Sequence, residues 1–168
     1  PDGPNCSYTI GYWKTHSEYG PAGPADETWE QLPNGPDTPF FLSGTTWYNV
    51  FWTAVKGNKY YSLAHQFMGA HLNFLSGADP TDAQAAYDAA KVLFETYTPT
   101  QVKESKSLNK EFGSYVGTLT DYNEGTIGPG HCDDREEEEF KSAKINTGLE
   151  EMLVYPNPMS NNGTINFR

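Results

Sequence analysis

The stretch CSYTIGYWKTH, residues 6–16, gathers the side chains of this sequence that are best suited to binding a ligand. Aromatic rings stack on flat sugar faces and attract cations, so Tyr12 and Trp13 can form a platform with Lys14 and His16 as polar contacts. The alternative is that these rings fill the hydrophobic core. Because the spacing matches no catalytic motif, we expect the structural role, with ligand binding as the second interpretation.

The histidines and acidic residues show no pattern typical of catalysis or metal binding. His65 and His71 are six residues apart, which places them on different faces of a helix, so they would not bind one ion together. The zinc-hydrolase pattern H-E-x-x-H, the G-x-S-x-G elbow, the Walker loop and the G-x-G-x-x-G loop are absent. Acids that could serve a glycoside hydrolase lie in a proline-rich loop, which positions catalytic groups poorly. We therefore expect no enzyme, no catalytic residues, no cofactor and no metal site.

The two cysteines, Cys6 and Cys132, lie at the two edges of the region that we expect to fold. Neither belongs to a C-x-x-C pair, which argues against a zinc knuckle or a thioredoxin-like motif. A disulfide between them would close nearly the whole folded region and would imply an oxidising, exported location. The alternative is two free, partly buried thiols.

Composition narrows the class of protein. The formal charge is -11, with 22 acidic against 11 basic residues, which argues against nucleic acid and against anionic lipid as partners. No stretch approaches the ~20 apolar residues of a transmembrane segment. Aromatic residues make up 14% of the chain, so a few large rings can fill a core that has few aliphatic side chains.

Two helical patterns follow the N-terminal part of the chain. The first covers residues 46–57, with Thr46 as the N-terminal cap and Gly57 as the end. The second covers residues 59–77 and is apolar almost all round, which predicts a central helix that ends at Gly77.

Two further helical patterns complete the predicted helical domain. In residues 79–97, Asp79 fits the N-cap and Pro80 fits the first helical position. The last pattern covers residues 108–125, and a shorter helical turn is expected to start at Thr98. Short connections between these patterns predict a bundle of about four helices.

Residues 17–46 are rich in Gly and Pro, which excludes a helix or a central strand there. We expect a long structured loop held in place by Trp29, Phe40 and Phe41, with Trp29 as a further candidate ring for a ligand. The predicted fold class of residues 1–132 is therefore mainly α, a helical bundle with an irregular N-terminal layer.

The chain changes character after Cys132. Residues 133–148 begin with the acidic run DDREEEEF, which is typical of a solvated linker and lacks the spaced oxygens of a calcium loop. Residues 149–168 contain two strand-like runs joined by a Pro/Asn/Gly turn. Because two strands alone are marginally stable in water, we expect this β-strand tail to pair with a partner.

Three segments together resemble a module of exported bacterial proteins: CSYTIGYWKTH, then GNKYYSLAHQFMGAHLN, and finally YNEGTIGPGHC. That module begins with a Cys-x-Tyr-Thr-x-Gly-Tyr-Trp-Lys-Thr-His signature and ends with Gly-Pro-Gly-x-Cys. The resemblance covers about residues 6–132 and implies an exported domain with paired terminal cysteines and no established activity.

The stretch VYPNPMSNNGTINF, residues 154–167, resembles the start of the C-terminal sorting domain of type IX secretion in Bacteroidota. The residues that carry this likeness are Tyr155, Pro156, Asn157 and Pro158. The resemblance implies the type IX secretion machinery as a partner, with export across the outer membrane and then release or attachment at the cell surface.

Taken together, these features predict a non-enzymatic extracellular module with a structural or adhesive role. It would be a subunit of a filament or another assembly, associating with itself or with another surface protein through its C-terminal strands. The alternative is a carbohydrate-binding module that uses exposed aromatic residues to bind glycans.

Overall fold

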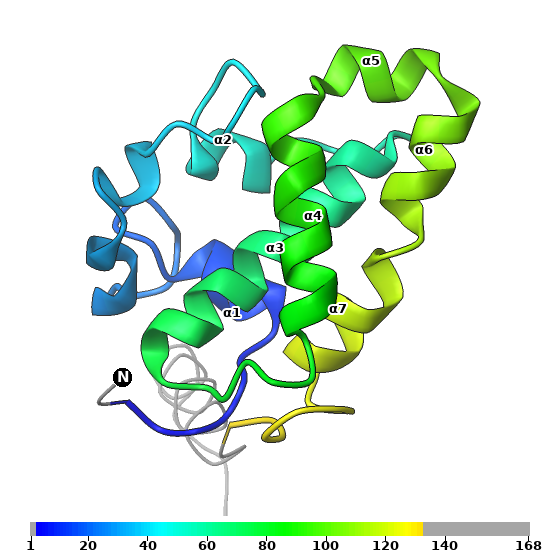
Figure 1. The fold of residues 1–168 in the computed structure, drawn as a ribbon. Helices are drawn as coiled ribbons and strands as arrows, with labels where there is room; N and C mark the ends of the chain where they lie inside the picture. The colour runs from blue at the N-terminus through cyan, green and yellow to red at the C-terminus, as the bar shows by residue number, and fades with distance from the viewer. Residues whose placement is uncertain (1–2, 133–168) are drawn as a thin grey trace, which may run out of the picture. The chain divides into compact units, whose positions relative to one another are not determined.

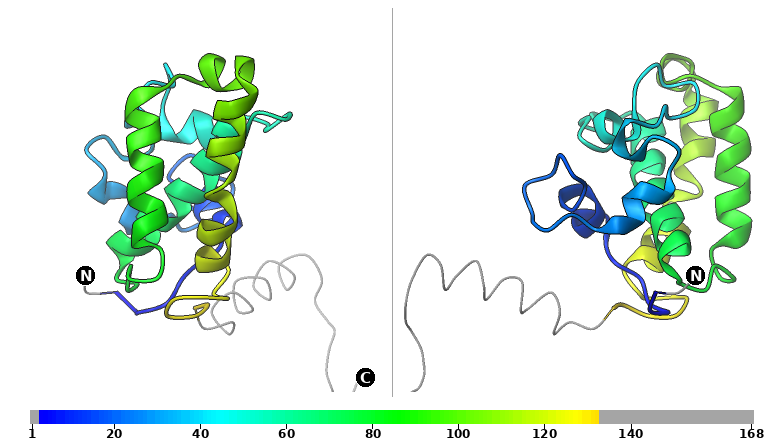
Figure 2. Two further views of the ribbon diagram at one scale, coloured as in Figure 1. Left: turned by 45° about the vertical axis from the view of Figure 1, so that its right-hand side comes forward. Right: turned by 90° about the vertical axis from the view of Figure 1, so that its left-hand side faces the viewer.

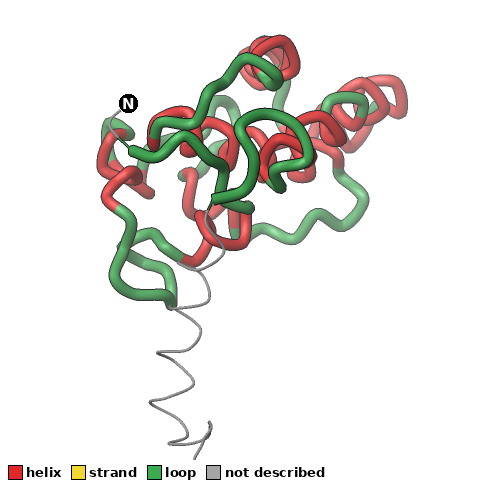
Figure 3. Tube along the Cα trace, turned by 90° about the horizontal axis from the view of Figure 1, so that it is seen from below, coloured by secondary structure: helices red, strands yellow, loops and turns green. Residues whose placement is uncertain are grey.

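The computed structural model describes residues 3–132, and the chain up to Cys132 forms one compact unit. The described residues form helices and loops, with two isolated β-bridges and no longer strand (Figure 3). This confirms the prediction of a mainly α fold. The expected acidic linker at 133–148 and the expected strands at 149–168 lie outside the described residues.

The helix α3 (Lys59–Ser76) is the centre of the fold (Figure 1). The helices packed against it are α1 (Ile10–Thr15), α2 (Trp47–Phe51), α4 (Gln84–Thr96), α5 (Pro99–Glu104), α6 (Lys106–Gly113) and α7 (Val116–Asn123). Half of its residues are buried, as its apolar sequence predicts, and Gly77 ends it at a φ of 119°, a left-handed conformation that glycine adopts without strain. The predicted central helix is confirmed.

The helix predicted over residues 46–57 is shorter than expected. Thr46 caps its start by accepting a hydrogen bond from the backbone of Asn49, but α2 ends at Phe51. The following residues form turns, and Lys56 and Gly57 both have positive φ values. This bend places Asn58 where its side chain caps the start of α3, so the reversal of the chain replaces the last turn of the predicted helix.

The helix predicted from Asp79 begins later, at Gln84. The Asp79 side chain accepts hydrogen bonds from the backbone and the hydroxyl of Thr81, and its carbonyl accepts one from Tyr122 Oη at 2.8 Å. A side chain that bonds to the backbone two residues on holds a turn in place of a helix. The contact with the distant Tyr122 fixes that turn.

The helix predicted over 108–125 is divided into α6 and α7, which meet at Ser114 and Tyr115. Ser114 Oγ donates to the Glu111 carbonyl at 2.6 Å and so satisfies one of the last carbonyls of α6. The expected helical turn at Thr98 is confirmed as α5, which begins with a capping box between Thr98 and Gln101.

The N-terminal layer contains short helices as well as loops. The 3-10 helices η1 (Glu27–Gln31) and η2 (Gly35–Asp37) lie within the predicted loop, and Trp29 and Phe40 anchor it in the core. The short helix α1 was not predicted. Its start is capped by the Thr9 hydroxyl, which accepts a hydrogen bond from the backbone of Tyr12.

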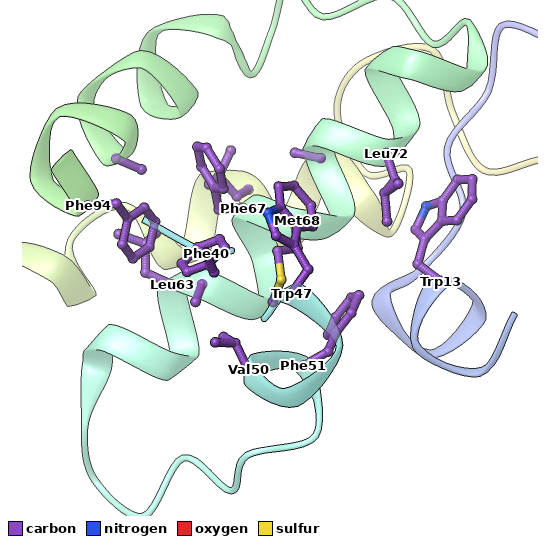
Figure 4. Close-up of a cluster of buried hydrophobic side chains, with 14 of the residues drawn as sticks. Trp13, Phe40, Trp47, Val50, Phe51, Leu63, Phe67, Met68, Leu72 and Phe94 are labelled. Carbon is purple, nitrogen blue, oxygen red and sulfur yellow. The ribbon is translucent and has the colours of Figure 1, made fainter. Parts of the chain in front are cut away.

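Aromatic rings fill the core, as the composition suggests (Figure 4). Phe40, Phe67 and Phe94 contact one another at centroid distances between 5.0 and 6.1 Å, and all three pairs are edge to face. This geometry is the favourable one for aromatic pairs, because it brings the positive edge of one ring to the negative face of another.

A disulfide joins Cys6 to Cys132 across a sequence separation of 126, which confirms the predicted pairing. Short parallel backbone contacts continue it: Ser7 N donates to Gly130 O and Cys132 N donates to Ser7 O, both at 2.8 Å. The bond therefore closes almost all described residues in one covalent loop. None of the helices between residues 3 and 132 has both the length and the apolar character needed to cross a bilayer.

Candidate functional site

The signature segment CSYTIGYWKTH contributes mainly to the core. The indole of Trp13 is completely buried, and its Nε1 donates to Asn73 Oδ1 at 3.0 Å. The same Asn73 side chain accepts from Tyr8 N at 2.8 Å and donates to Tyr8 O at 3.0 Å. One buried asparagine of α3 therefore holds both the backbone and the tryptophan of the signature.

The network continues from Asn73 into α7. Asn73 Nδ2 donates to Asn123 Oδ1 at 3.0 Å, and Asn123 Nδ2 donates to the Gln66 carbonyl at 2.9 Å. Gly69 allows this close approach, because a Cβ there would lie 2.9 Å from both Asn123 Nδ2 and Ile10 Cγ2. Buried polar groups of this kind rigidify a core when every member is bonded.

Tyr8, Tyr12 and His16 form a stack along α1, with centroid distances of 3.9 Å for each neighbouring pair. Tyr12 Oη donates to Asp26 Oδ2 at 2.6 Å, and His16 Nδ1 lies 2.7 Å from the Tyr12 carbonyl. These contacts tie α1 to the N-terminal layer rather than leaving the polar atoms for a ligand.

The second tryptophan considered for ligand binding is also in the core. Trp29 is 2% exposed, and its Nε1 donates to the Trp13 carbonyl at 3.1 Å. Neither Trp13 nor Trp29 offers an exposed ring face. The burial of both rings agrees with the structural role that we expect for the signature; the second interpretation, in which Trp13 with Tyr12, or Trp29, stacks on a ligand, would need these rings at the surface.

Lys14 leads from the signature to a different set of rings at the surface. Its Nζ lies 4.3 Å from the centroid of the Trp52 ring, within the range of a cation–π contact. Trp52 is 43% exposed and contacts Tyr48, which in turn contacts Tyr19, 48% exposed. We call Tyr19, Tyr48, Trp52 and Lys14 the aromatic strip.

The rings of the aromatic strip are not coplanar. Tyr19 and Tyr48 are 5.4 Å apart at 81°, and Tyr48 and Trp52 are 6.2 Å apart at 42°. Polar groups border the rings: Tyr19 Oη donates to Asp37, and Tyr48 Oη donates to the Tyr19 carbonyl at 3.3 Å. The hydrogen bond to Asp37, more than any other cause, raises the pKa of Tyr19 above its ordinary value. The strip therefore combines aromatic rings with two phenolic hydroxyl groups and the ammonium group of Lys14.

The histidines of α3 have structural partners. His65 Nε2 lies 2.8 Å from the Val50 carbonyl, and burial lowers the pKa of His65. His71 Nδ1 lies 2.7 Å from Tyr87 Oη; burial, followed by the charge of Lys91, lowers the pKa of His71 to about 4. Burial likewise raises the pKa of Tyr87 to about 12, so both groups are neutral near pH 7.

Within residues 3–132, no group of three or more histidine, cysteine or acidic side chains is placed to hold a metal ion. The acids considered for glycoside hydrolysis are spread over the N-terminal layer, where Asp26 caps η1 and binds Tyr12. The residues of the sorting motif, Tyr155 to Pro158, lie outside the described part of the chain.

Sequence reasoning named Lys14 but missed the three rings of the aromatic strip. Trp52 lies within the helix predicted over residues 46–57, and it directly follows the end of α2 at Phe51. It is four residues after Tyr48 and so lies on the same side as that ring, away from the buried side of α2. Tyr19 has no local feature that distinguishes it from the buried tyrosines. The four-residue spacing of Tyr48 and Trp52 is the signal in the sequence that could have pointed to this surface.

Comparisons with protein-family models, with curated protein sequences and with solved structures found no match to this chain.

Proposed function

We propose that this chain is a non-enzymatic extracellular module that serves a structural or adhesive role on the surface of a bacterial cell. The observation that carries the proposal is the disulfide between Cys6 and Cys132, which closes a domain whose core includes Tyr8 and Trp13 of the signature segment. Disulfides persist in exported proteins and are rare in reducing compartments.

The role of the signature segment supports a structural function. Trp13, the largest side chain of the signature, is fully buried, and its only polar atom is bonded to Asn73. A buried and hydrogen-bonded side chain of this kind stabilises the domain, and contacts with other molecules are then made by other residues at the surface. The likeness of Tyr155–Pro158 to a sorting motif supports export by the type IX secretion machinery.

Assembly through the C-terminal residues is the second part of the proposal. Strand-forming sequences that lack a sheet of their own can satisfy their backbone groups by adding to a neighbour's sheet. Deletion of residues 149–168 should therefore abolish assembly, measured by sedimentation or electron microscopy, while the circular dichroism of the helical domain is unchanged. Normal assembly by the deleted protein would show that strand exchange is wrong.

The aromatic strip favours carbohydrate binding as a second candidate function. Trp52 and Tyr19 are both more than two-fifths exposed, and their neighbours are hydroxyls, a carboxylate and an ammonium group. Sugar rings stack on such faces while their hydroxyls bond to the polar rim. Because the rings lie at 42° and 81° to one another, the strip suits a single twisted glycan chain better than a flat crystalline surface.

A glycan array tests this second candidate. Trp52→Ala should abolish any binding, whereas Trp52→Phe, which keeps an aromatic ring at that position, should retain much of it. Equal glycan binding by wild type and Trp52→Ala would exclude the aromatic strip as the binding site.

A further inference from the structure

Lysines gather on one face of α6 in a chain that is acidic overall. Lys106 and Lys110 are exposed and four residues apart, so they share a face of the helix. Gly113 continues that face, and a Cβ built there would lie 3.4 Å from Lys59 Cδ. The exposed Lys59 of α3 therefore lies along the same line. We call Lys59, Lys106 and Lys110 the lysine stripe.

The contact between α3 and α6 holds the stripe in place. Lys59 N donates to Asn109 Oδ1 at 2.8 Å, which fixes the start of α3 against the middle of α6. Glu111, the only acid within α6, lies about 100° around the helix from Lys110. The stripe thus presents cations without an acidic residue of α6 between them.

Such an arrangement does not favour folding. Like charges four residues apart on a helix repel each other and destabilise it, as Lys106 and Lys110 do here. The chain carries 22 acidic residues, so carboxylates that could neutralise these lysines are plentiful elsewhere in the sequence. A row of cations that repel one another is the arrangement expected where an anionic partner binds.

The densest anionic segment of this chain is the run DDREEEE, residues 133–139, which directly follows Cys132. Figures 1 and 2 show α5 and the start of α6 at one end of the helical domain and the loop to Cys132 at the other. Cys132, the last described residue before the run, therefore lies at the end of the helical domain opposite the start of α6.

We propose that the lysine stripe of one copy binds the acidic run, residues 133–139, of a second copy. The contact joins two different surfaces, so it is head to tail and can extend into an open chain of subunits. It rests on the proposed function as an assembling module but uses a surface different from the C-terminal strands. Its attraction is electrostatic and is screened by salt.

Charge reversal in the full-length chain tests the inference, with sedimentation velocity at low and high salt as the readout. Lys106→Glu/Lys110→Glu should lose self-association at low salt, and so should Glu136→Lys/Glu137→Lys/Glu138→Lys/Glu139→Lys, which leaves two acidic and five basic residues in the run. Mixing the two variants should restore association, because the reversed stripe then faces the reversed run. Lys91→Glu, an exposed lysine of α4 outside the stripe, is the matched control and should associate like wild type.

Self-association of wild type that is unchanged by stripe reversal and insensitive to salt would overturn the inference. If deletion of residues 149–168 still abolished that association, the strand-exchange proposal would stand without it. Association that depends on the stripe but survives the deletion would support the inference and contradict strand exchange. Binding of an acidic polysaccharide to the stripe, without any association between copies, would also overturn it.

Discussion

Substitution of Asn73 by alanine tests the reasoning about the signature segment. The Asn73 side chain makes four hydrogen bonds, to Tyr8 N, Tyr8 O, Trp13 Nε1 and Asn123 Oδ1. All of these lie in the interior, and both asparagines are 0% exposed. Asn73→Ala leaves the partner groups buried without a hydrogen bond.

The magnitude follows from that count. A net value of about 1 kcal/mol for each lost bond gives a loss of about 4 kcal/mol in the free energy of unfolding. For a domain whose total stability is about 5–15 kcal/mol, such a loss is large. With a urea slope of about 1–3 kcal/mol per molar, the unfolding midpoint should fall by about 1–4 M.

The assay is urea unfolding without reductant, followed by tryptophan fluorescence. Asn109→Ala is the matched control, because it removes one hydrogen bond to Lys59 N at a partly exposed position and should lose less than about 1 kcal/mol. Trp13→Phe, which keeps a ring but lacks the indole N–H, should fall between the two. An Asn73→Ala midpoint as high as that of Asn109→Ala would refute the reasoning.

Three further substitutions test other parts of the structure. Tyr60 Oη is buried without a hydrogen-bond partner among the described residues, so Tyr60→Phe should raise the free energy of unfolding by about 1 kcal/mol or more in urea titrations; a clear loss would contradict this. Replacing Cys6 and Cys132 by serine should lower the free energy of unfolding by about 4–5 kcal/mol, since the bond closes a loop with a separation of 126 residues; an unchanged thermal midpoint would contradict it. Burial, followed by the charge of Lys91, lowers the pKa of His71 from 6.5 to about 4 in the folded protein. As the pH falls, the His71 imidazole is therefore protonated in the unfolded chain before it is protonated in the folded protein. Stability should therefore decrease by about 3 kcal/mol between pH 6.5 and 4, and His71→Gln should remove that part of the pH dependence; identical pH profiles would show that His71 is not responsible.

Features that depend on neighbouring residues could be predicted from the sequence. Gly77 ends α3 and Thr98 starts α5 as expected, because each signal acts within one turn of the helix. The apolar character of α3 likewise predicts its central place. The Cys6–Cys132 bond was also predictable, because each cysteine lies at an edge of the folded region.

Features that depend on distant contacts could not be predicted. Asp79 looks like a helix cap, but its carbonyl is bound by Tyr122 Oη, 43 residues later, and the helix begins after that turn. The pairing of Asn73 with Asn123 has no local signature. The contact between Tyr19 and Tyr48, 29 residues apart, likewise has no local signature.

The central claim is that a single covalent closure stabilises an exported helical domain. Its most direct test is peptide mapping by mass spectrometry of the protein produced by its natural host, recovered from the medium or the cell surface and alkylated before any reduction. The account predicts a linked Cys6–Cys132 peptide and no alkylated thiol. Alkylation of both cysteines, in protein found only inside the cell, would contradict it.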